Sequence, residues 1–323
     1  MPSTPDRVSI PATATAAAPP MMNGGDWLLL ILLATVWGAS YFFVKVAVGD
    51  VGPFTVAFVR VLLAGAILLA IMKGRGMPLP RTRTVWIAYL VLGLTNSALP
   101  YSLIFWGETR IPSGLAGILT AMVPVWTVLA AHLMTTDERL SALKAAGMTL
   151  GMLGVVIIMG EDLGALGDGS ALGKLAVVVA TALYGFSNVF ARRVKHRPSL
   201  ELAWGQMITA TLWMLPLALI DRPWSTAHWS AGAVAAMLAL TLVSTVLAYF
   251  VYFRLLGTVG ATNTSQIGFL IPISSLILGA VFLHEALVPI QLVGLVLIIA
   301  GMALIDGRIV QRLRPSLAAS LSR

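Results

Sequence analysis

The sequence predicts an all-α integral membrane protein whose ten transmembrane helices form two inverted repeats of five helices. Three observations lead to this fold class. Hydrophobic residues make up 58% of the 323 residues and charged residues only 11%. Ten apolar runs are long enough to cross a bilayer, and motifs of the first half recur in the second. A soluble domain carries about 25% charged residues, so this chain has too few polar side chains to cover a water-facing surface.

The ten apolar runs are separated by short segments rich in Gly, Pro and charged residues. A helix of about 20 apolar residues crosses the hydrocarbon core of a bilayer. In chain order we expect helices at 27–48, 53–72, 85–106, 113–134, 140–160, 172–191, 201–220, 231–253, 261–283 and 287–305. The loops between these runs are too short for an extramembrane catalytic domain.

The charge distribution predicts the orientation of the chain in the membrane. Residues 1–25 lack the basic start and continuous apolar core of a signal peptide, so we expect a disordered cytoplasmic tail. The repeats then occupy 26–160 and 161–307, and 308–323 form a basic cytoplasmic tail. With the N-terminus inside, most of the 21 Lys and Arg residues fall on the inner side, as the positive-inside rule requires. The net charge of +8 therefore needs no nucleic-acid partner.

The internal repeat is visible in two sets of motifs. "WGASYFFVK" begins at Trp37 and "YGFSNVFAR" at Tyr184, and both read aromatic-Gly-x-Ser-x-x-Phe-x-basic. Further along, one Pro, one Glu and two Gly recur in order, as Pro124, Glu138, Gly147 and Gly154, then Pro272, Glu285, Gly294 and Gly301. Because each half has an odd number of helices, the second half enters the membrane from the opposite side. Inverted repeats are typical of secondary transporters, with the binding site near the midplane.

Glu138 in "TTDERL" and Glu285 in "FLHEAL" each precede a helix. The N-terminal end of a helix stabilises an anion, so we expect both carboxylates to cap helices, with gating or proton handling as the alternative. The neighbouring His284 is expected to be an interfacial residue. A metalloprotease motif is absent, because Val288 stands where the second His is required.

The repeated Pro and Gly residues predict bends and close contacts. Pro124 and Pro272 kink equivalent helices, either as hinges between inward-facing and outward-facing states or as static bends that widen a cavity. The repeated glycines give helices 5 and 10 small faces that allow close approach. We expect them to pack helices within the chain, and a contact between two molecules is the alternative.

The repeated Pro…Glu-x-Leu…Gly…Gly pattern and the "WGAS" opening resemble the EamA-type permeases of the drug/metabolite transporter superfamily, over roughly 27–305. The resemblance implies two EamA repeats, ten helices, cytoplasmic termini and a multi-pass location in the bacterial inner membrane. It implies export of small metabolites, amino acids among them, by alternating access coupled to protons. His284 departs from the family pattern, in which a Gly precedes the Glu.

Several other functions compete with this expectation. The cargo could instead be a drug, an amine or a nucleotide sugar. Transport without ion coupling, as in a facilitator, is a further alternative. A membrane-embedded lipid enzyme is disfavoured, because the sequence has no nucleophile elbow and no Asp/His cluster, and no P-loop supports direct ATP drive. We therefore expect no catalytic residues, no cofactor and no metal. The expected partners are a small-molecule substrate, protons and the lipid bilayer, and the oligomeric state is left open.

The resemblance implies that helices 1, 3, 4, 6, 8 and 9 line the substrate cavity. These helices offer aromatic and polar candidates: Trp37, Ser40, Tyr41, Asn96, Tyr101, Tyr184, Ser187, Asn188, Ser244, Tyr249 and Gln266. Aromatic walls with a few polar groups suit small amphipathic cargo. Alternatively, the Ser and Asn side chains form hydrogen bonds between packed helices.

Charged residues within the spans are the remaining candidates, because ionisable groups inside a bilayer are costly and usually functional. Arg60 lies within helix 2, where we expect it to attract a substrate carboxylate or to pair with Glu108. Alternatively, it forms an ion pair that packs helices, or its side chain extends to the membrane interface. Glu108, near the outer end of helix 3, and His132, near the end of helix 4, are candidate proton carriers.

Overall fold

The computed structural model describes residues 22–136, 140–160, 169–222, 227–286 and 288–307, and all regular secondary structure in these ranges is helical. Glu138 and most of both predicted tails lie outside the described residues. Within the described part of the chain, nine helical spans are long and apolar enough to cross a membrane, and α13 (Ile267–Phe282) is a shorter apolar helix. The prediction of an all-α membrane protein with ten helices is confirmed.

Several spans consist of more than one helical segment. The first repeat contains α1 (Gly24–Val48), α2 (Pro53–Gly74), α3 (Arg83–Gly93), η1 (Leu94–Ala98), α4 (Leu99–Glu108), α5 (Ser113–Thr120), α6 (Val123–Met134) and α7 (Ala142–Gly160). The second repeat contains α8 (Gly169–Phe190), η2 (Ala191–Val194), α9 (Ser199–Ile220), α11 (Ala231–Thr241), η3 (Leu242–Leu247), α12 (Ala248–Thr264), α13 and α14 (Pro289–Asp306). Segments α3, η1 and α4 form the third span, and α11, η3 and most of α12 form the eighth.

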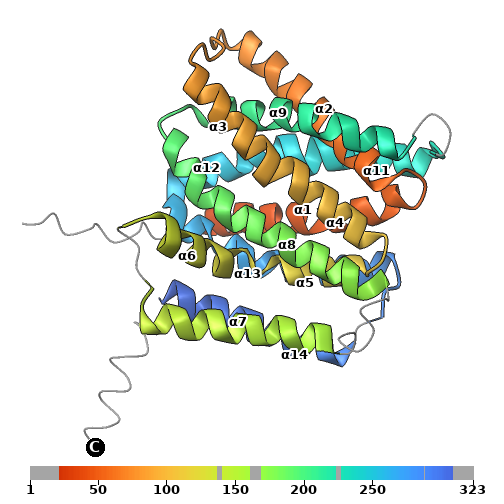
Figure 1. Cartoon of the computed structure of the whole chain (residues 1–323), viewed down its shortest axis with the longest axis vertical. Helices are drawn as coiled ribbons and strands as arrows, with labels where there is room; N and C mark the ends of the chain where they lie inside the picture. Colours follow the sequence, from red (N-terminus) through yellow and green to blue (C-terminus); the bar gives the residue numbers. More distant parts are fainter. Residues whose placement is uncertain (1–21, 137–139, 161–168, 223–226, 287, 308–323) are drawn as a thin grey trace, which may run out of the picture.

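The helices pack as the inverted repeat requires. α1 packs against α13 and α11, and its counterpart α8 packs against α5, α6 and α4. Three further contacts, α2 with α9, α7 with α14 and α5 with α13, each join a helix to its own counterpart. Figure 1 shows α7 and α14 side by side along one edge of the molecule. The contacts are therefore duplicated between the two halves.

Two π-helical segments interrupt equivalent spans. η1 begins at Leu94, seven residues before Tyr101, and η3 begins at Leu242, seven residues before the equivalent residue, Tyr249. π-helical turns are rare and occur frequently at functional sites. Both segments lie near the middle of their spans, so they mark the centre of the bundle in both repeats.

Repeated glycines allow the closest helix contacts. A Cβ atom on Gly185 would lie 2.6 Å from the backbone of Trp126, and a Cβ on Gly38 would lie 2.9 Å from the backbone nitrogen of Ser275. A Cβ on Gly154 would lie 2.7 Å from the carbonyl oxygen of Gly294, across the α7–α14 contact. The prediction that the repeated glycines pack helices within the chain is confirmed for these residues.

The eighth span is longer than expected. It continues beyond residue 253 to Gly260, whose φ of 77° interrupts the helix. Leu255 and Val259 are almost fully buried, so packing of their side chains keeps the segment between residue 253 and Gly260 helical. The expected start of helix 9 at residue 261 coincides with the break.

The two prolines have different local settings. The fourth span is divided between α5 and α6, and Pro124 lies in the first turn of α6, where its missing N–H is tolerated. Pro272 lies inside the continuous helix α13. The equivalent prolines therefore accompany a divided helix in one repeat and an unbroken helix in the other.

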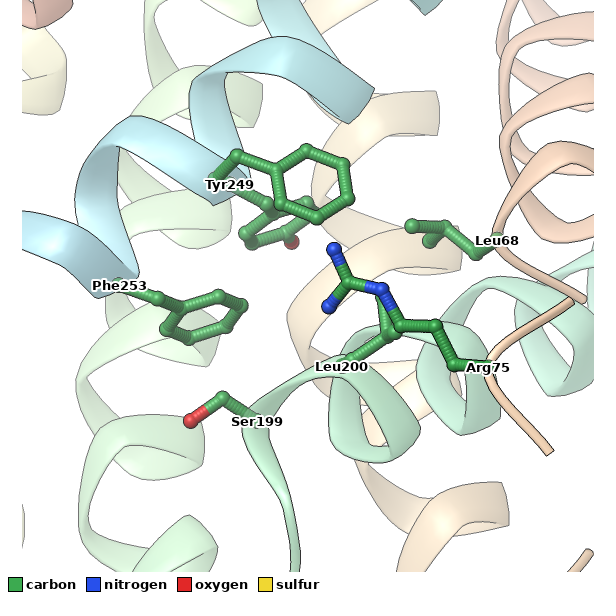
Figure 2. A pocket seen from close by; sticks show the side chains of 7 residues that line it. Leu68, Arg75, Ser199, Leu200, Tyr249 and Phe253 are labelled. Atoms are coloured by element: carbon green, nitrogen blue, oxygen red, sulfur yellow. The ribbon is translucent and has the colours of Figure 1, made fainter. Parts of the chain in front are cut away.

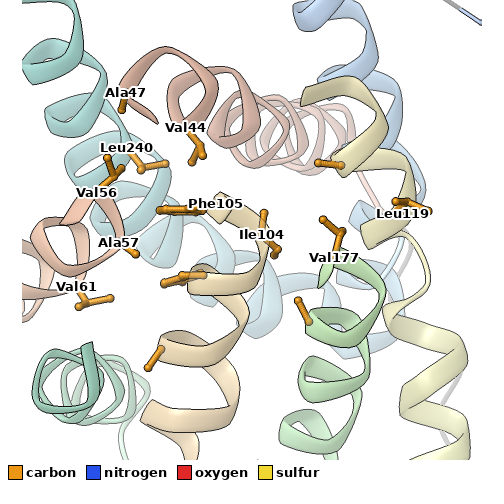
Figure 3. Close-up of a cluster of buried hydrophobic side chains, with 14 of the residues drawn as sticks. Val44, Ala47, Val56, Ala57, Val61, Ile104, Phe105, Leu119, Val177 and Leu240 are labelled. Carbon is orange, nitrogen blue, oxygen red and sulfur yellow. The ribbon is translucent and has the colours of Figure 1, made fainter. Parts of the chain in front are cut away.

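We call the end of the bundle with the last turn of α1 and the first turn of α2 the Lys45 end. We call the opposite end, with the last turn of α2 and the first turn of α9, the Arg75 end. The buried apolar core extends toward both ends, since it includes Val44 near the first and Leu68 and Met72 near the second. Figure 3 shows part of this core. The labelled members are Val44, Ala47, Val56, Ala57, Val61, Ile104, Phe105, Leu119, Val177 and Leu240.

Candidate functional site

Four tyrosines from both repeats lie near Arg60 in the bundle, and one of them, Tyr101, is in direct contact with it. We call Tyr41 of α1, Tyr101 of α4, Tyr184 of α8 and Tyr249 of α12 the tyrosine cluster. Electrostatic interactions link Tyr184 to the other three tyrosines and to Arg60, and link Tyr249 to Tyr101 and Arg60. The structure thus brings together the four tyrosines and the arginine that the sequence singled out.

The walls of the tyrosine cluster follow the repeat symmetry. Tyr101 stacks on Phe105 with ring centroids 5.8 Å apart and an interplanar angle of 16°. Tyr249 stacks on Phe253 at 5.7 Å and 12°. The two phenylalanines were not among the sequence candidates. The recurring Tyr-x-x-x-Phe spacing, which places both rings on one helix face, would have identified them.

Arg60 is a buried cation with one hydrogen-bond partner among the residues that the structure describes. Its side chain is 7% exposed, and its Nε donates a hydrogen bond to Thr245 Oγ1 at 2.9 Å. The guanidinium carbon lies 4.2 Å from the centroid of the Tyr101 ring. Within the described residues no carboxylate lies at ion-pair distance from Arg60, so the pairing with Glu108 that we considered is not formed. A desolvated cation–π contact contributes about 2 kcal/mol, and an arginine at the centre of a membrane helix costs about 2.5–3.5 kcal/mol.

Glu108 is a buried carboxylate without a hydrogen-bond partner in the described part of the chain. The residue is 0% exposed, and neither carboxylate oxygen accepts a hydrogen bond there. Lys45 Nζ donates instead to the backbone oxygens of Glu108 at 2.6 Å and Ile111 at 2.8 Å. Glu108 also interacts electrostatically with Lys45, Glu285 and Arg60. A buried charge is costly unless it is paired, so this carboxyl is the strongest protonation candidate.

Glu285 caps a helix of the other repeat. Its carboxylate accepts hydrogen bonds from Ser113 N at 2.7 Å, Gly114 N at 3.0 Å and Ser113 Oγ at 3.1 Å. We expected a cap on the helix that follows in sequence, and this was wrong, because the residue preceding α14 is Val288, which makes no side-chain cap. The first turn of α5 offers two free amides within reach. Glu285 therefore joins the two repeats at the Lys45 end.

His284 adopts a left-handed backbone conformation, with φ of 54°. Such a conformation favours Gly, so the Gly that the resemblance led us to expect here would suit this turn better than His284 does. The turn positions the next residue, whose backbone N donates to Gly279 O at 3.1 Å. The side chain of His284 is exposed. Its backbone conformation thus serves to direct Glu285 toward α5.

Most of the other polar candidates are engaged between helices. The hydrogen bonds join Asn96 to Gln206, Ser187 to Thr95, Asn188 to Thr127, Ser244 to Val36 O and Tyr41 to Thr120. Ser40 Oγ is buried and has no partner in the described residues. These contacts support the alternative that many Ser and Asn side chains serve helix packing.

Three further candidates lie apart from the tyrosine cluster. Trp37 packs against Tyr252, with centroids 5.5 Å apart, in a separate apolar cluster. Gln266 is the half-buried residue before α13. His132 is exposed near the end of α6 and accepts a 3.4 Å contact from Leu140 N. The structure does not bring these side chains together with Arg60.

A small cavity lies at the Arg75 end and reaches the tyrosine cluster through Tyr249. Its volume is about 190 Å³, and its lining residues are Leu68, Arg75, Ser199, Leu200, Tyr249, Phe250 and Phe253. Figure 2 shows the Arg75 side chain extending from the end of α2 toward the rings of Tyr249 and Phe253. The guanidinium carbon of Arg75 lies 5.7 Å from the Phe250 ring centroid. The sequence revealed Arg75 only as one of the basic residues on the inner side.

The arrangement suits binding of a small amphipathic molecule. Aromatic rings from both repeats supply apolar contact, and Arg60 supplies charge. In the described part of the chain, no group of three or more His, Cys, Asp or Glu residues could hold a metal ion.

Comparisons with known proteins extend over nearly the whole chain. A model of the EamA-like transporter family matches residues 26–160 and 171–306. The chain is 28% identical to the uncharacterized transporter YvbV of Bacillus subtilis, over 86% of this chain and 90% of that one. It is 26% identical to a probable amino-acid metabolite efflux pump of Salmonella typhimurium, over 87% and 94% of the two chains. A solved crystal structure with 19% identity superposes with a TM-score of 0.62 and covers 88% of this chain and 98% of its own.

Proposed function

Because the chain belongs to the EamA-like transporter family, we propose that it exports small amphipathic metabolites, amino acids among them, by alternating access coupled to protons. The observation that carries this proposal is the tyrosine cluster with Arg60, which both repeats build at the centre of the bundle. Inverted-repeat transporters bind cargo at the repeat interface near the midplane. The name of the Salmonella relative, an amino-acid metabolite efflux pump, supports the choice of cargo.

The packing of the two ends supports alternating access. At the Lys45 end, the Lys45 hydrogen bonds and the Glu285 cap join helices across the bundle and close it. At the Arg75 end, a cavity reaches the tyrosine cluster. We propose that this conformation faces the Arg75 end and that transport alternates it with one open at the Lys45 end. Pro124 and Pro272 are the proposed hinges.

Glu108 is the proposed proton carrier. Its carboxyl is buried, lacks a hydrogen-bond partner in the described residues and lies near both Lys45 and Glu285. Opening the Lys45 end would hydrate this carboxyl and ionise it, because water removes the cost of burying the charge. Glu108 would then take up a proton when the Lys45 end closes. Exchange of protons for cargo requires such a coupling between protonation and the conformational change.

The orientation and location follow from the same proposal. We propose that both chain ends lie on the side of the Arg75 end, because the number of spans is even, and that this side is cytoplasmic, as the predicted charge asymmetry favours. Cargo would then enter the cavity from the cytoplasm and leave at the Lys45 end. We propose the inner membrane of a bacterium as the location, and transport without an enzymatic step as the activity.

Reconstitution into liposomes tests the proposal. Purified protein would be assayed for uptake of a panel of radiolabelled amino acids, with and without an imposed pH gradient. We expect saturable uptake that the gradient accelerates. Glu108→Gln should abolish the gradient response while leaving exchange of labelled for unlabelled cargo. The matched control is Asp26→Asn, at the exposed start of α1, which should behave as the unmodified protein.

Each alternative gives a different result in this assay. Uptake that ignores the gradient in the unmodified protein indicates a facilitator. Uptake of amines or drugs in place of amino acids identifies the efflux alternative. If folded protein moves none of these compounds under any gradient, the proposed function is wrong.

A further inference from the structure

Arg60 and Gln206 occupy equivalent positions in the two repeats. Ala57 and Ala64 flank Arg60 at the spacing at which Ala203 and Ala210 flank Gln206. Arg60 donates to Thr245 in η3, and Gln206 accepts from Asn96 in η1 at 2.8 Å. The same contact between a second helix of one repeat and a π-helical segment of the other is therefore made once by a cation and once by a neutral amide.

Packing does not explain why this position carries a charge. Gln206 shows that an uncharged side chain of similar reach makes the inter-repeat contact. An arginine in the same place must be desolvated, at a cost of about 2.5–3.5 kcal/mol. A charge that is costly and not required for packing indicates a ligand of opposite sign.

The free donors of Arg60 are the second observation. A guanidinium has five N–H donors, and Thr245 uses the one on Nε. The two terminal amines have no hydrogen-bond partner in the described residues, and neither of them is fully buried. They therefore reach open space, while the guanidinium stays 4.2 Å from the Tyr101 ring. Two parallel amines held in this way form a fork that matches a carboxylate.

Arg75 extends the positive charge to the mouth of the cavity. It lies about four turns beyond Arg60 on the same helix, is exposed, and is the one charged residue among the described residues that line the cavity. The cavity reaches Tyr249, which interacts with Tyr101 and Arg60. Clefts lined by one sign of charge concentrate ligands of the opposite sign. An anion would therefore meet favourable charge at the entrance and at the centre.

We propose that the cargo is a small organic carboxylate with an apolar or aromatic body, whose carboxylate binds the terminal amines of Arg60. The tyrosine cluster and the Tyr101–Phe105 and Tyr249–Phe253 stacks contact the apolar body, and Arg75 attracts the carboxylate to the cavity. This inference rests on the proposed function and narrows it. Amino acids satisfy it through their carboxylate, whereas amines that lack a carboxylate do not.

The test uses four compounds that share a phenyl ring: 3-phenylpropionate, phenylalanine, phenylalanine amide and phenethylamine. Equilibrium binding to the purified protein is measured by calorimetry, and counterflow is measured in liposomes. We expect 3-phenylpropionate and phenylalanine to bind and exchange, and the two compounds without a carboxylate to do neither. Because charge-assisted hydrogen bonds are strong, Arg60→Gln should weaken carboxylate binding about 10–100-fold.

Three further variants sharpen this result. Arg60→Lys keeps the charge and loses the fork, so it should retain part of the affinity. Arg75→Gln should slow uptake at low salt and remove much of its salt dependence. Arg110→Gln is the matched control, because Arg110 also lies over an aromatic ring, that of Trp106 at 3.7 Å, but is exposed at the end of α4. It should change neither binding nor exchange.

The outcomes separate this inference from the proposed function. One outcome is exchange of phenethylamine or of phenylalanine amide that is unchanged in Arg60→Gln. It would support the proposed transport function and overturn the carboxylate assignment. A second outcome is binding of carboxylates that Arg60→Gln abolishes, with no exchange of any compound. It would support the carboxylate assignment and overturn the proposed transport function. Absence of carboxylate binding, or binding that Arg60→Gln leaves unchanged, overturns the inference. A melting temperature for Arg60→Gln close to that of the unmodified protein would show that the variant folds.

Discussion

In the first repeat the residue that contacts the opposite π-helical segment is Arg60, and in the second repeat it is Gln206. Around this difference the two repeats agree closely. Both have a stacked Tyr–Phe pair and a π-helical turn at the same place. The comparison teaches that the duplicated contacts build the scaffold, and that Arg60, a charge without a counterpart in the second repeat, marks where the scaffold acquires its chemistry.

The largest effect is expected where the repeats are alike, at the α7–α14 contact. Gly154 meets Gly294, and the symmetry-related contact joins Gly301 to Gly147. A new Cβ would lie 2.7 Å from a carbonyl in Gly154→Ala and 2.5 Å in Gly301→Ala, and backbone atoms cannot yield as side chains do. Each variant should lose about 1–3 kcal/mol of stability, measured as thermal stability in detergent.

Gly74→Ala is the control for this pair, since it is helical and a Cβ there meets nothing within 4 Å. It should be neutral or slightly stabilising. A large loss in only one of the two glycine variants would show that the scaffold is less symmetric than its contacts.

A smaller effect is expected from moving the unmatched charge. The double variant Arg60→Gln, Gln206→Arg places the guanidinium against Asn96 instead of Thr245, still between the repeats. We expect it to regain about tenfold in 3-phenylpropionate affinity over Arg60→Gln alone, equivalent to about 1.4 kcal/mol, measured by calorimetry. No regain would mean that the Tyr101 ring beneath Arg60 is as necessary as the charge.

The helix caps test whether the symmetry extends to the turns. Glu285→Gln removes the charge from the first turn of α5 and should cost about 0.5–1 kcal/mol of stability. The repeat predicts that Glu138→Gln costs the same, through a cap on the ninth span. Melting temperatures of the two variants and of their combination provide the measurement. A harmless Glu138→Gln would confine this cap to one repeat.

The smallest effect is a gain. His284→Gly relieves a left-handed backbone conformation, with φ of 54°. Because added chain entropy of the unfolded state offsets much of this relief, stability should rise by only about 0.3 kcal/mol. Ala286→Gly, two residues further and also exposed, is the control and should lower stability slightly through added chain entropy. A thermal melt distinguishes the two, and equal changes in both variants would contradict the role of the backbone angle.

The sequence predicts the scaffold well because its causes are local. Apolar run length identifies the spans, and Gly154 and Gly294 mark a close contact without reference to any partner. The π-helical segments were not predictable, because hydrophobic spacing does not distinguish them from α-helix. The helical stretch up to Gly260 was missed because Arg254 resembled the start of a loop, whereas the burial of Leu255 and Val259 decides the conformation.

The candidate site was predicted only in part. Tyr41, Tyr101, Tyr184, Tyr249 and Arg60 do converge. The partner of Arg60 is 185 residues away in the chain, and no sequence pattern links them. Similarly, the sequence does not show that Ser187 and Ser244 form hydrogen bonds to neighbouring helices instead of facing a cavity. Contacts between distant segments therefore decide which polar residues are left for cargo.

The Glu285 cap also has a consequence for biogenesis. The first turn of α5 is synthesised 172 residues before the carboxylate that completes it. At about 5–20 residues per second on the ribosome, the Ser113 and Gly114 amides wait roughly 10–30 s. Until the ninth span and Glu285 have been made, the first turn of α5 must satisfy these amides with water or with another partner.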